Sequence, residues 1–276
     1  MRAEPIAAAT RQLPVPGRVL YPALQAIGAR LTYPIAPRVV RSQLGFKIEI
    51  RDYEEHIQRY IYWLGRFEPR ESAVVRDLLE PGDCVIDAGA NIGWFSLLAS
   101  SIVGTAGKIF AFEPMGATAE HLDRNLALNG ASNVEVHRIA LSDRRGEAKL
   151  TVTETGNIGT ASLFATDSDE GEIVDTGRLD DIVPKRGFKL LKMDVEGAEL
   201  KVLHGAEKLL NARRIENILF EVNEAALRRG GSTCAELVAL VKSHGYRVWR
   251  IGRFGPQPFD LKVTLGQNVS VLASCR

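Results

Sequence analysis

The stretch Val85-Ile86-Asp87-Ala88-Gly89-Ala90-Asn91-Ile92-Gly93-Trp94 decides the fold of this chain. Its apolar start predicts a buried parallel strand, and the amphipathic pattern that opens at Ile92 predicts a helix. Glycine between the two lets the backbone turn tightly and lets a ligand approach with no Cβ in the way. The helix would direct its positive N-terminal end at that ligand. We therefore expect a nucleoside-binding fold to begin here.

Apolar runs and helical patterns alternate along the rest of the chain. The expected strands are the run at Val85, Lys108–Phe112, Val134–Ile139, Phe188–Met193, Ile215–Val222, Tyr246–Ile251 and Val269–Ala273. The expected helices are Tyr53–Leu64, Glu68–Leu79, Ile92–Ile102, Ala117–Leu128, Ala198–Leu210 and Cys234–Ser243. This alternation predicts an α/β fold with a parallel sheet, whose ligands sit at the carboxyl ends of the strands. Between Ala140 and about Gly177, short Thr-, Gly- and Asp-rich pieces predict hairpins or a loop over that site.

The composition bounds the class of protein. With 276 residues, 45% hydrophobic and 25% charged, the chain is typical of a globular protein, and its net charge of +1 gives no global case for nucleic acid. The three cysteines, Cys84, Cys234 and Cys275, lack metal-ligand spacing and suit a reducing compartment. No apolar stretch reaches the roughly 20 residues that span a bilayer, and the first residues lack a secretory pattern. We expect a cytoplasmic protein.

The first 45 residues differ from the rest of the chain. No acidic residue lies between Glu4 and Glu49, whereas arginines, a lysine and six prolines are spread through this part. Apolar residues among them make a candidate surface for an anionic membrane or a protein partner, and an extension lying on the core is the simpler interpretation. We expect an extension over 1–45 and one domain over 46–276, with N-terminal helices at 53–80 and a Rossmann-like core at 83–276.

The glycine spacing distinguishes between cofactors. A dinucleotide site needs the pattern G-x-G-x-x-G, but those positions hold Gly89, Asn91 and Trp94. A ligand without pyrophosphate, such as S-adenosylmethionine, fits better. Asp87 would meet its ammonium group directly or through water, and Glu113, which ends the run Phe110-Ala111-Phe112, would accept hydrogen bonds from its ribose diol. The helix start at Ile92 would face the carboxylate of its tail.

Eight motifs in order resemble the FkbM-type family of S-adenosylmethionine-dependent methyltransferases over roughly residues 46–252. They are Leu64-Gly65-Arg66-Phe67-Glu68-Pro69, Pro81-Gly82-Asp83, Ile86–Gly93, Phe112-Glu113-Pro114, Ala140-Leu141-Ser142-Asp143, Leu179-Asp180-Asp181, Lys192–Glu199 and Phe220-Glu221-Val222. The resemblance implies a class I methyltransferase fold, a three-layer sandwich whose mostly parallel seven-stranded sheet has an antiparallel last strand. It also implies methyl transfer, typically to a hydroxyl of a natural product, sugar, glycan or glycolipid.

The resemblance also assigns roles at the edges of the cofactor site. Ser142 and Asp143, after the third strand, would contact adenine, and Glu68 would close the pocket from its N-terminal side. Gly89, Asn91 and Gly93 belong to the turn that holds the cofactor. Trp94 and Phe112 flank this pocket, where they would stack on the ligand or simply belong to the core.

Three carboxylates are candidates for the chemistry. Methyl transfer to an alcohol needs in-line positioning and a general base. Asp194 closes the fourth strand and Glu196 follows at the start of a helix, so we expect one of them to be the base or to orient the acceptor, with Glu221 shaping the pocket. Alternatively, Glu196 complements the helix charge only. Together with Asn223, the three could instead hold a divalent cation such as Mg²⁺, an alternative that we do not favour because no histidine joins them.

Two other functions remain open at this point. An NAD(P)-dependent oxidoreductase is disfavoured by Asn91 and Trp94, and a non-catalytic binding protein that retains the fold is disfavoured by the presence of Asp87, Glu113, Asp194 and Glu196. The sequence leaves open the acceptor, the choice between O-, N- and C-methylation, and the oligomeric state.

Overall fold

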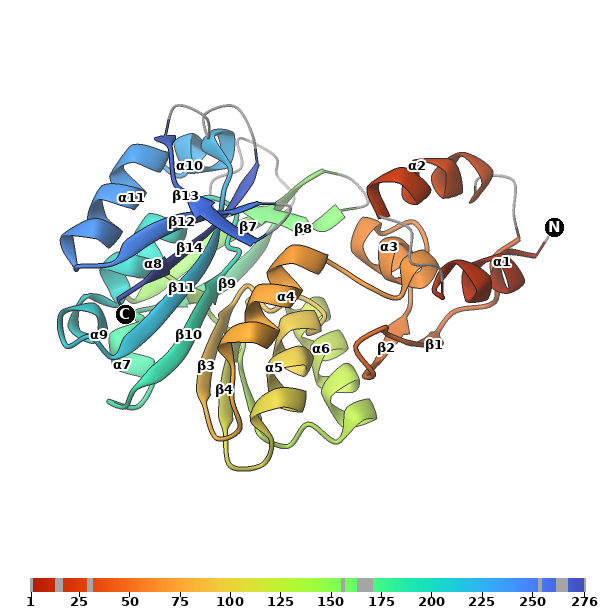
Figure 1. Ribbon diagram of the computed structural model, residues 1–276, viewed down its shortest axis with the longest axis horizontal. Helices are drawn as coiled ribbons and strands as arrows, with labels where there is room; N and C mark the ends of the chain where they lie inside the picture. The colour runs from red at the N-terminus through yellow and green to blue at the C-terminus, as the bar shows by residue number, and fades with distance from the viewer. Residues whose placement is uncertain are drawn as a thin grey trace.

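The computed structural model describes residues 2–12, 17–28, 32–154, 157–162, 171–252, 255–261 and 268–275. Within these ranges, a central sheet lies between two layers of helices (Figure 1). The sheet has the strand order β13-β12-β14-β11-β10-β3-β4-β5. Its strands are β3 (Cys84–Ala88), β4 (Lys108–Phe112), β5 (Val134–His137), β10 (Phe188–Met193), β11 (Ile215–Val222), β12 (Arg247–Gly252), β13 (Gly255–Pro258) and β14 (Val269–Ser274).

The strand directions match those expected of a class I methyltransferase. Strands β3, β4, β5, β10 and β11 pair in parallel, whereas β14 is antiparallel to both β11 and β12. The mostly parallel sheet with an antiparallel last strand is therefore confirmed. The described sheet has eight strands rather than seven. The additional strand is β13, which pairs antiparallel with β12, with Gly255 opposite Gly252.

Successive side chains of a strand point to opposite faces of the sheet, and each face has its own core. On one face, Val85 and Leu190 pack with residues of α4 (Pro69–Leu78), α5 (Trp94–Val103) and α6 (Gly116–Asn129). On the other, Ile86 and Leu191 join a core that also contains residues of the C-terminal helices. These helices are α7 (Leu179–Ile182), α8 (Glu199–Gly205), α9 (Glu207–Asn211), α10 (Glu224–Arg229) and α11 (Cys234–Ser243). The fold is a three-layer sandwich.

The prediction of one continuous helix over Ala198–Leu210 is wrong, because the segment is divided into α8 and α9. Ala206, between them, has φ −112° and ψ 11°, which is not helical. The side chain of Asp180 accepts hydrogen bonds from the backbone N–H groups of Lys208 (2.9 Å) and Leu209 (3.0 Å). A carboxylate from a distant part of the chain thus caps the second helix, which a local helical pattern cannot reveal.

The N-terminal elements pack beside the sandwich. They are α1 (Ala3–Thr10), α2 (Gly17–Gly28), β1 (Arg38–Arg41), β2 (Lys47–Ile50) and α3 (His56–Leu64), drawn in red to orange in Figure 1. The hydroxyl of Thr10 donates to the backbone oxygen of Trp63 at 2.6 Å, which ties α1 to α3. Strand β1 pairs with β2, so the expected boundary near residue 45 falls within a hairpin.

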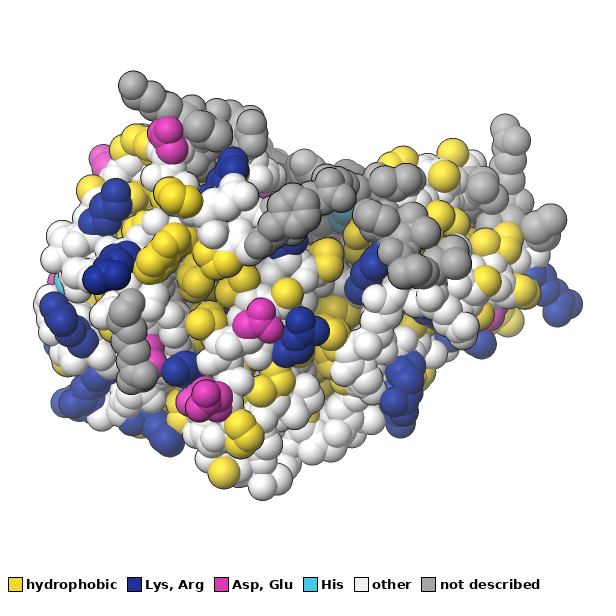
Figure 2. Space-filling model, in the orientation of Figure 1, with side chains coloured by type: hydrophobic (Ala, Val, Ile, Leu, Met, Phe, Trp, Pro, Cys, Tyr) yellow, Lys and Arg dark blue, Asp and Glu magenta, His cyan; other side chains and the backbone are white. Residues whose placement is uncertain are grey.

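The region from 140 to 177 forms hairpins, as its pattern predicts. Strands β6 (Ala140–Leu141), β7 (Gly146–Glu154), β8 (Asn157–Ser162) and β9 (Glu172–Gly177) make a sheet in the order β6-β9-β7-β8. Figure 2 shows basic and acidic side chains interspersed on the face of the molecule seen in Figure 1. Of the helices described here, none combines the length and the apolar character needed to cross a bilayer.

Candidate active site

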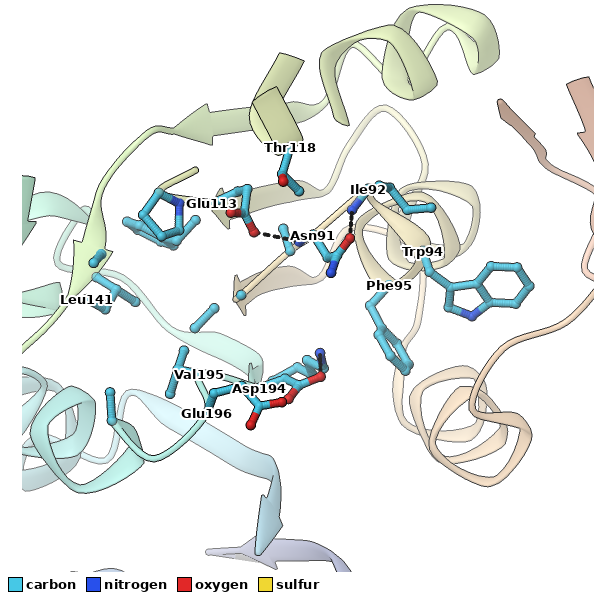
Figure 3. A pocket seen from close by; sticks show the side chains of 18 of the residues that line it. Asn91, Ile92, Trp94, Phe95, Glu113, Thr118, Leu141, Asp194, Val195 and Glu196 are labelled. Atoms are coloured by element: carbon cyan, nitrogen blue, oxygen red, sulfur yellow. Dashed lines mark hydrogen bonds and ion pairs between the residues drawn. The ribbon is translucent and has the colours of Figure 1, made fainter. Parts of the chain in front are cut away.

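A cavity of about 290 Å³ opens at the carboxyl ends of the central strands. Its wall is formed by the turn after β3, the end of β4, the start of α5 and the loop after β10. Figure 3 shows Glu113 and Asn91 on one side of this cavity and Asp194 and Glu196 on the opposite side. Parallel strands place these side chains together because their carboxyl ends meet at one edge of the sheet.

The turn after β3 requires a glycine. Gly89 has a φ of +78°, and a Cβ at this position would overlap the backbone oxygen of Asp194. The backbone N–H groups of Gly89 and Ala90 both donate to the backbone oxygen of Phe112, at 3.0 and 2.9 Å. The close approach therefore holds the ends of β3, β4 and β10 together around the cavity.

Glu113 is fixed by the backbone around it. One oxygen of its carboxylate, Oε2, accepts a hydrogen bond from the N–H of Asn91 at 2.9 Å, and Oε1 accepts one from the N–H of Met115 at 3.0 Å. Burial raises the pKa of Glu113 to about 7, although the two backbone donors oppose the shift. Each oxygen keeps a lone pair for a ligand, which makes Glu113 an oriented bidentate acceptor.

The opposite wall is a group of carboxylates around Asp194. Burial and the neighbouring Asp194 raise the pKa of Glu196 to about 8 and that of Glu221 to about 7. The same two causes raise the pKa of Glu68 well above its ordinary range. Like charges held this close disfavour simultaneous ionisation, so this wall can take up and release protons near neutral pH.

Lys192 is the functional residue that the sequence reasoning missed. Its ammonium nitrogen lies 3.4 Å from Oδ2 of Asp194 and 4.6 Å from the centre of the Phe95 ring, and the residue is only 6% exposed. Burial works against its charge, but Asp194 and Asp87 outweigh burial and raise the pKa of Lys192. The run Phe188–Met193 contains two lysines, Lys189 and Lys192, and a charged residue beside the last residue of a buried strand is the signal that could have identified Lys192.

Backbone strain also marks the cavity. Four residues other than glycine in the described chain have a positive φ, and three of them, Glu68 (39°), Asn91 (50°) and Glu196 (50°), line the cavity. Such conformations cost on the order of 1 kcal/mol or more and cluster at functional sites. The fourth, Arg213, lies elsewhere on the surface.

The structure brings seven of the eleven expected site residues to the cavity wall. Glu68, Gly89, Asn91, Glu113, Asp194, Glu196 and Glu221 all line it, whereas Asp87, Gly93, Ser142 and Asp143 do not.

The residues outside the wall have other contacts. Asp87 is 1% exposed, and its Oδ2 accepts a hydrogen bond from the Ser96 hydroxyl at 2.7 Å. Its other oxygen is buried without a hydrogen-bond partner among the described atoms. The Ser142 hydroxyl donates to Asp143 at 3.0 Å, and Gly93 precedes α5.

The two aromatic residues that the sequence placed at the pocket belong largely to the core. Trp94 donates from its indole N–H to the Ser72 hydroxyl at 2.9 Å and packs edge-on against Phe46. Phe112 stacks on His137 with ring centres 4.8 Å apart. Within the described residues, no group of three or more His, Cys, Asp and Glu side chains has an arrangement that could hold a metal ion.

The strand order, the glycine turn after β3 and the acidic residue that follows β4 are those of the class I methyltransferase fold. Comparison with known families gives the particular group: residues 87–248 match the methyltransferase FkbM domain, and the chain belongs to this family. The expected resemblance is confirmed, and the dinucleotide and non-catalytic alternatives are not favoured.

Three relatives illustrate the family. The chain is 32% identical over 203 residues to methyltransferase 1 of Beauveria bassiana, covering 65% of this chain and 78% of that protein. It is 29% identical over 202 residues to the 31-O-demethyl-FK506 methyltransferase FkbM of Streptomyces tacrolimicus, covering 62% and 75%. It is also 30% identical over 215 residues to the AMB antimetabolite synthetase AmbE of Pseudomonas aeruginosa, covering 62% of this chain but only 10% of that protein.

Proposed function

We propose that this protein is an S-adenosylmethionine-dependent methyltransferase that methylates a hydroxyl group of a small molecule. The observation that carries the proposal is the position of Glu113, an oriented carboxylate at the end of β4 that faces an acidic, lysine-containing wall across one cavity. S-adenosylmethionine supplies an activated methyl group, so the protein has mainly to position the reactants and accept a proton.

The residues present fit this cofactor. The two oxygens of Glu113 suit a ribose diol, and the absence of a side chain at Gly89 lets the backbone of Asp194 approach the turn beside the cavity. The apolar side chains of Phe112, Ile139 and Leu141 line the same cavity and suit a purine ring. Asp87 has a buried oxygen without a described partner close behind the turn, which suits an ammonium group reached through water.

The acidic wall would handle the proton of the acceptor hydroxyl. Lys192 stabilises the negative charge of Asp194, so Asp194 is suited to orienting the hydroxyl. Burial and the charge of Asp194 raise the pKa of Glu196 to about 8, which suits a general base near neutral pH. We assign the proton acceptor to Glu196 and the orienting role to Asp194, with Glu221 shaping the site between them.

The nature of the acceptor is supported by the relatives rather than by the cavity alone. The Streptomyces tacrolimicus relative is named as a methyltransferase of 31-O-demethyl-FK506, an O-demethyl compound. A hydroxylated small molecule is the corresponding acceptor for this chain.

Binding of S-adenosylhomocysteine tests the proposal. We expect isothermal titration calorimetry to detect binding to the wild type, and Glu113→Gln to weaken it by about 10- to 100-fold, because one of the two acceptor oxygens becomes a donor. Glu120→Gln, on the exposed side of α6, is the control and should bind like the wild type. Absence of binding to the wild type, or unchanged binding by Glu113→Gln, would contradict the proposal.

A further inference from the structure

A second cavity, of about 500 Å³, adjoins the first. It lies between α4, the ends of β10, β11 and β14, and the β12–β13 hairpin. Four residues line both cavities: Glu68, Lys192, Asp194 and Glu221. Asp194 and Glu221, two of the residues assigned to the chemistry, therefore lie between a space that suits the cofactor and a space that is open to another molecule, whereas Glu196 lines the first cavity alone.

The second cavity is more polar than the first. Beyond the shared residues, it is lined by Arg70 and Glu71 from α4, Arg250 and Gln257 from the β12–β13 hairpin, and Ser270 from β14. Ser270 donates its hydroxyl to Glu71, so that this carboxylate already has a partner. A polar lining of this kind suits a ligand with several hydrogen-bonding groups and disfavours an apolar one.

The two arginines add positive charge to this lining. Among the described residues, neither Arg70 nor Arg250 forms an ion pair, and Arg250 donates a hydrogen bond to the amide oxygen of Gln257 at 2.7 Å. A guanidinium group presents donors in a planar fork that matches a carboxylate, sulfate or phosphate.

We propose that the second cavity is the acceptor site and that the acceptor carries an anionic group, bound by Arg250 and Arg70, as well as the hydroxyl that is methylated. This inference rests on the proposed function, which it extends from a hydroxylated molecule to a hydroxylated acid. With the anion held at the arginines, the hydroxyl lies at the shared residues Asp194 and Glu221, next to the cofactor cavity.

The reaction balances with groups already named. The O–H bond of the acceptor breaks, and its proton passes to the carboxylate of Glu196. The oxygen forms a bond to the methyl carbon as the bond between that carbon and the sulfonium sulfur breaks. The products are a methyl ether and the neutral thioether S-adenosylhomocysteine. The anionic group of the acceptor takes no part in this step and serves only for recognition.

The first experiment tests the anion subsite and uses sulfate as the probe. Thermal unfolding is followed with saturating S-adenosylhomocysteine, in sodium sulfate and in sodium chloride of equal ionic strength. Sulfate also stabilises proteins in general, so the comparison is between Arg250→Gln and the control Arg247→Gln, an exposed arginine of the same strand outside the cavity lining. We expect the control to keep the full sulfate-dependent rise in Tm and Arg250→Gln to lose part of it.

The second experiment tests the acceptor class with labelled S-adenosylmethionine and matched pairs of compounds, such as glucuronic acid with glucose. We expect methylation to favour the acid in each pair, and Arg250→Gln to reduce kcat/KM for the acids at least 10-fold while S-adenosylhomocysteine binds normally. Equal sulfate effects in both variants would overturn the inference, as would neutral compounds methylated as well as their acids. If none of the compounds is methylated, the comparison of sulfate-dependent Tm between the two variants alone tests the inference. Failure of the wild type to bind S-adenosylhomocysteine would instead overturn the proposed function.

Discussion

The two walls of the cofactor cavity both present carboxylates, but they hold them differently. Glu113 receives two backbone N–H groups, from Asn91 and Met115, and so has one orientation. Across the cavity, Asp194 is paired with the ammonium group of Lys192, and burial together with the charge of Asp194 raises the pKa of Glu196 and Glu221. The first wall fixes the orientation of its carboxylate, whereas the carboxylates of the second wall can gain and lose protons near neutral pH.

This difference indicates how the fold divides its tasks. A backbone donor cannot move without breaking the strand end, so a carboxylate that it fixes is suited to binding. Carboxylates that share one cation can exchange protons with little movement, which suits catalysis. Changes to the first wall should therefore affect ligand affinity, whereas changes to the second should affect turnover and its pH dependence.

The largest expected effect is that of Glu196→Gln on turnover. Removal of a general base reduces kcat by about 10²- to 10⁴-fold, and kcat of the wild type should rise with pH through about 8, where Glu196 ionises. The variant should lack this limb of the pH profile. Steady-state kinetics from pH 6 to 9 measure both effects. Binding of S-adenosylhomocysteine should be unchanged, and exposed Glu147→Gln is the control. A wild-type profile flat across this range would contradict the assignment.

Gly89→Ala should damage both walls together, because Gly89 is where they meet. Its added methyl group would overlap the backbone oxygen of Asp194, at a φ of +78° that alanine disfavours. Strain and overlap together should destabilise the fold by about 3 kcal/mol. Urea unfolding measures the loss, and calorimetry should show no binding of S-adenosylhomocysteine.

Gly82→Ala is a matched control for this effect. Gly82 has a φ of +90°, but no atom lies within 4 Å of a Cβ placed there. Only the backbone strain should remain, at about 1 kcal/mol, and ligand binding should be kept. Equal losses in the two variants would show that the contact with Asp194 contributes nothing.

Much of the fold could be predicted from local patterns. Each central strand is a short apolar run that ends at a polar residue, and the order of the motifs identified the family. The missed features depend on distant parts of the chain. The cap that divides α8 from α9 comes from Asp180, and β13 forms by pairing with β12. The hydrophobic pattern of residues 198–210 or 255–258 alone reveals neither feature.

The site was predictable where an acidic residue follows a strand or lies at its end. Glu113 and Asp194 directly follow β4 and β10, and Glu221 lies next to the last residue of β11, so the sequence shows that they converge. Lys192 lies equally close to the end of β10, opposite Asp87 on β3, but its role appears only when neighbouring strands are paired. Asp87 was placed correctly at a strand end, but its burial behind the cavity depends on packing against Ser96 of α5.

Stability should depend on pH through Glu199, a buried carboxyl close to Asp194, Glu196 and Glu221. Burial raises the pKa of Glu199 from 4.5 to about 7, and this residue is 3% exposed. The folded state therefore holds a proton that the unfolded state releases between these values, so stability is greatest below pH 4.5 and falls as pH rises to about 7. Glu199 alone corresponds to on the order of 3 kcal/mol across this range.

Glu199→Gln should flatten that dependence. The amide cannot ionise, so the difference in urea midpoint between pH 5 and pH 8 should be smaller in the variant than in the wild type. Glu120→Gln, on an exposed helix face, should keep the wild-type slope. If the urea midpoint fell more steeply with pH in Glu199→Gln than in the wild type, ionisation of Glu199 would be excluded as a cause of the pH dependence.

The smallest expected effect concerns the strained backbone of the binding wall. Asn91 and Arg213 both have a φ of +50°, which glycine adopts more readily. Arg213→Gly should raise the free energy of unfolding by up to about 1 kcal/mol and leave ligand binding unchanged. Asn91→Gly should gain less stability, because it loses the hydrogen bond from the Ile92 N–H to the Asn91 side chain (2.7 Å).

Asn91→Gly should also weaken S-adenosylhomocysteine binding several-fold, since a freer residue 91 no longer fixes the N–H that orients Glu113. Thermal shifts with and without ligand separate the two quantities, and equal ligand-induced shifts in both variants would show that the strain at Asn91 is unrelated to binding.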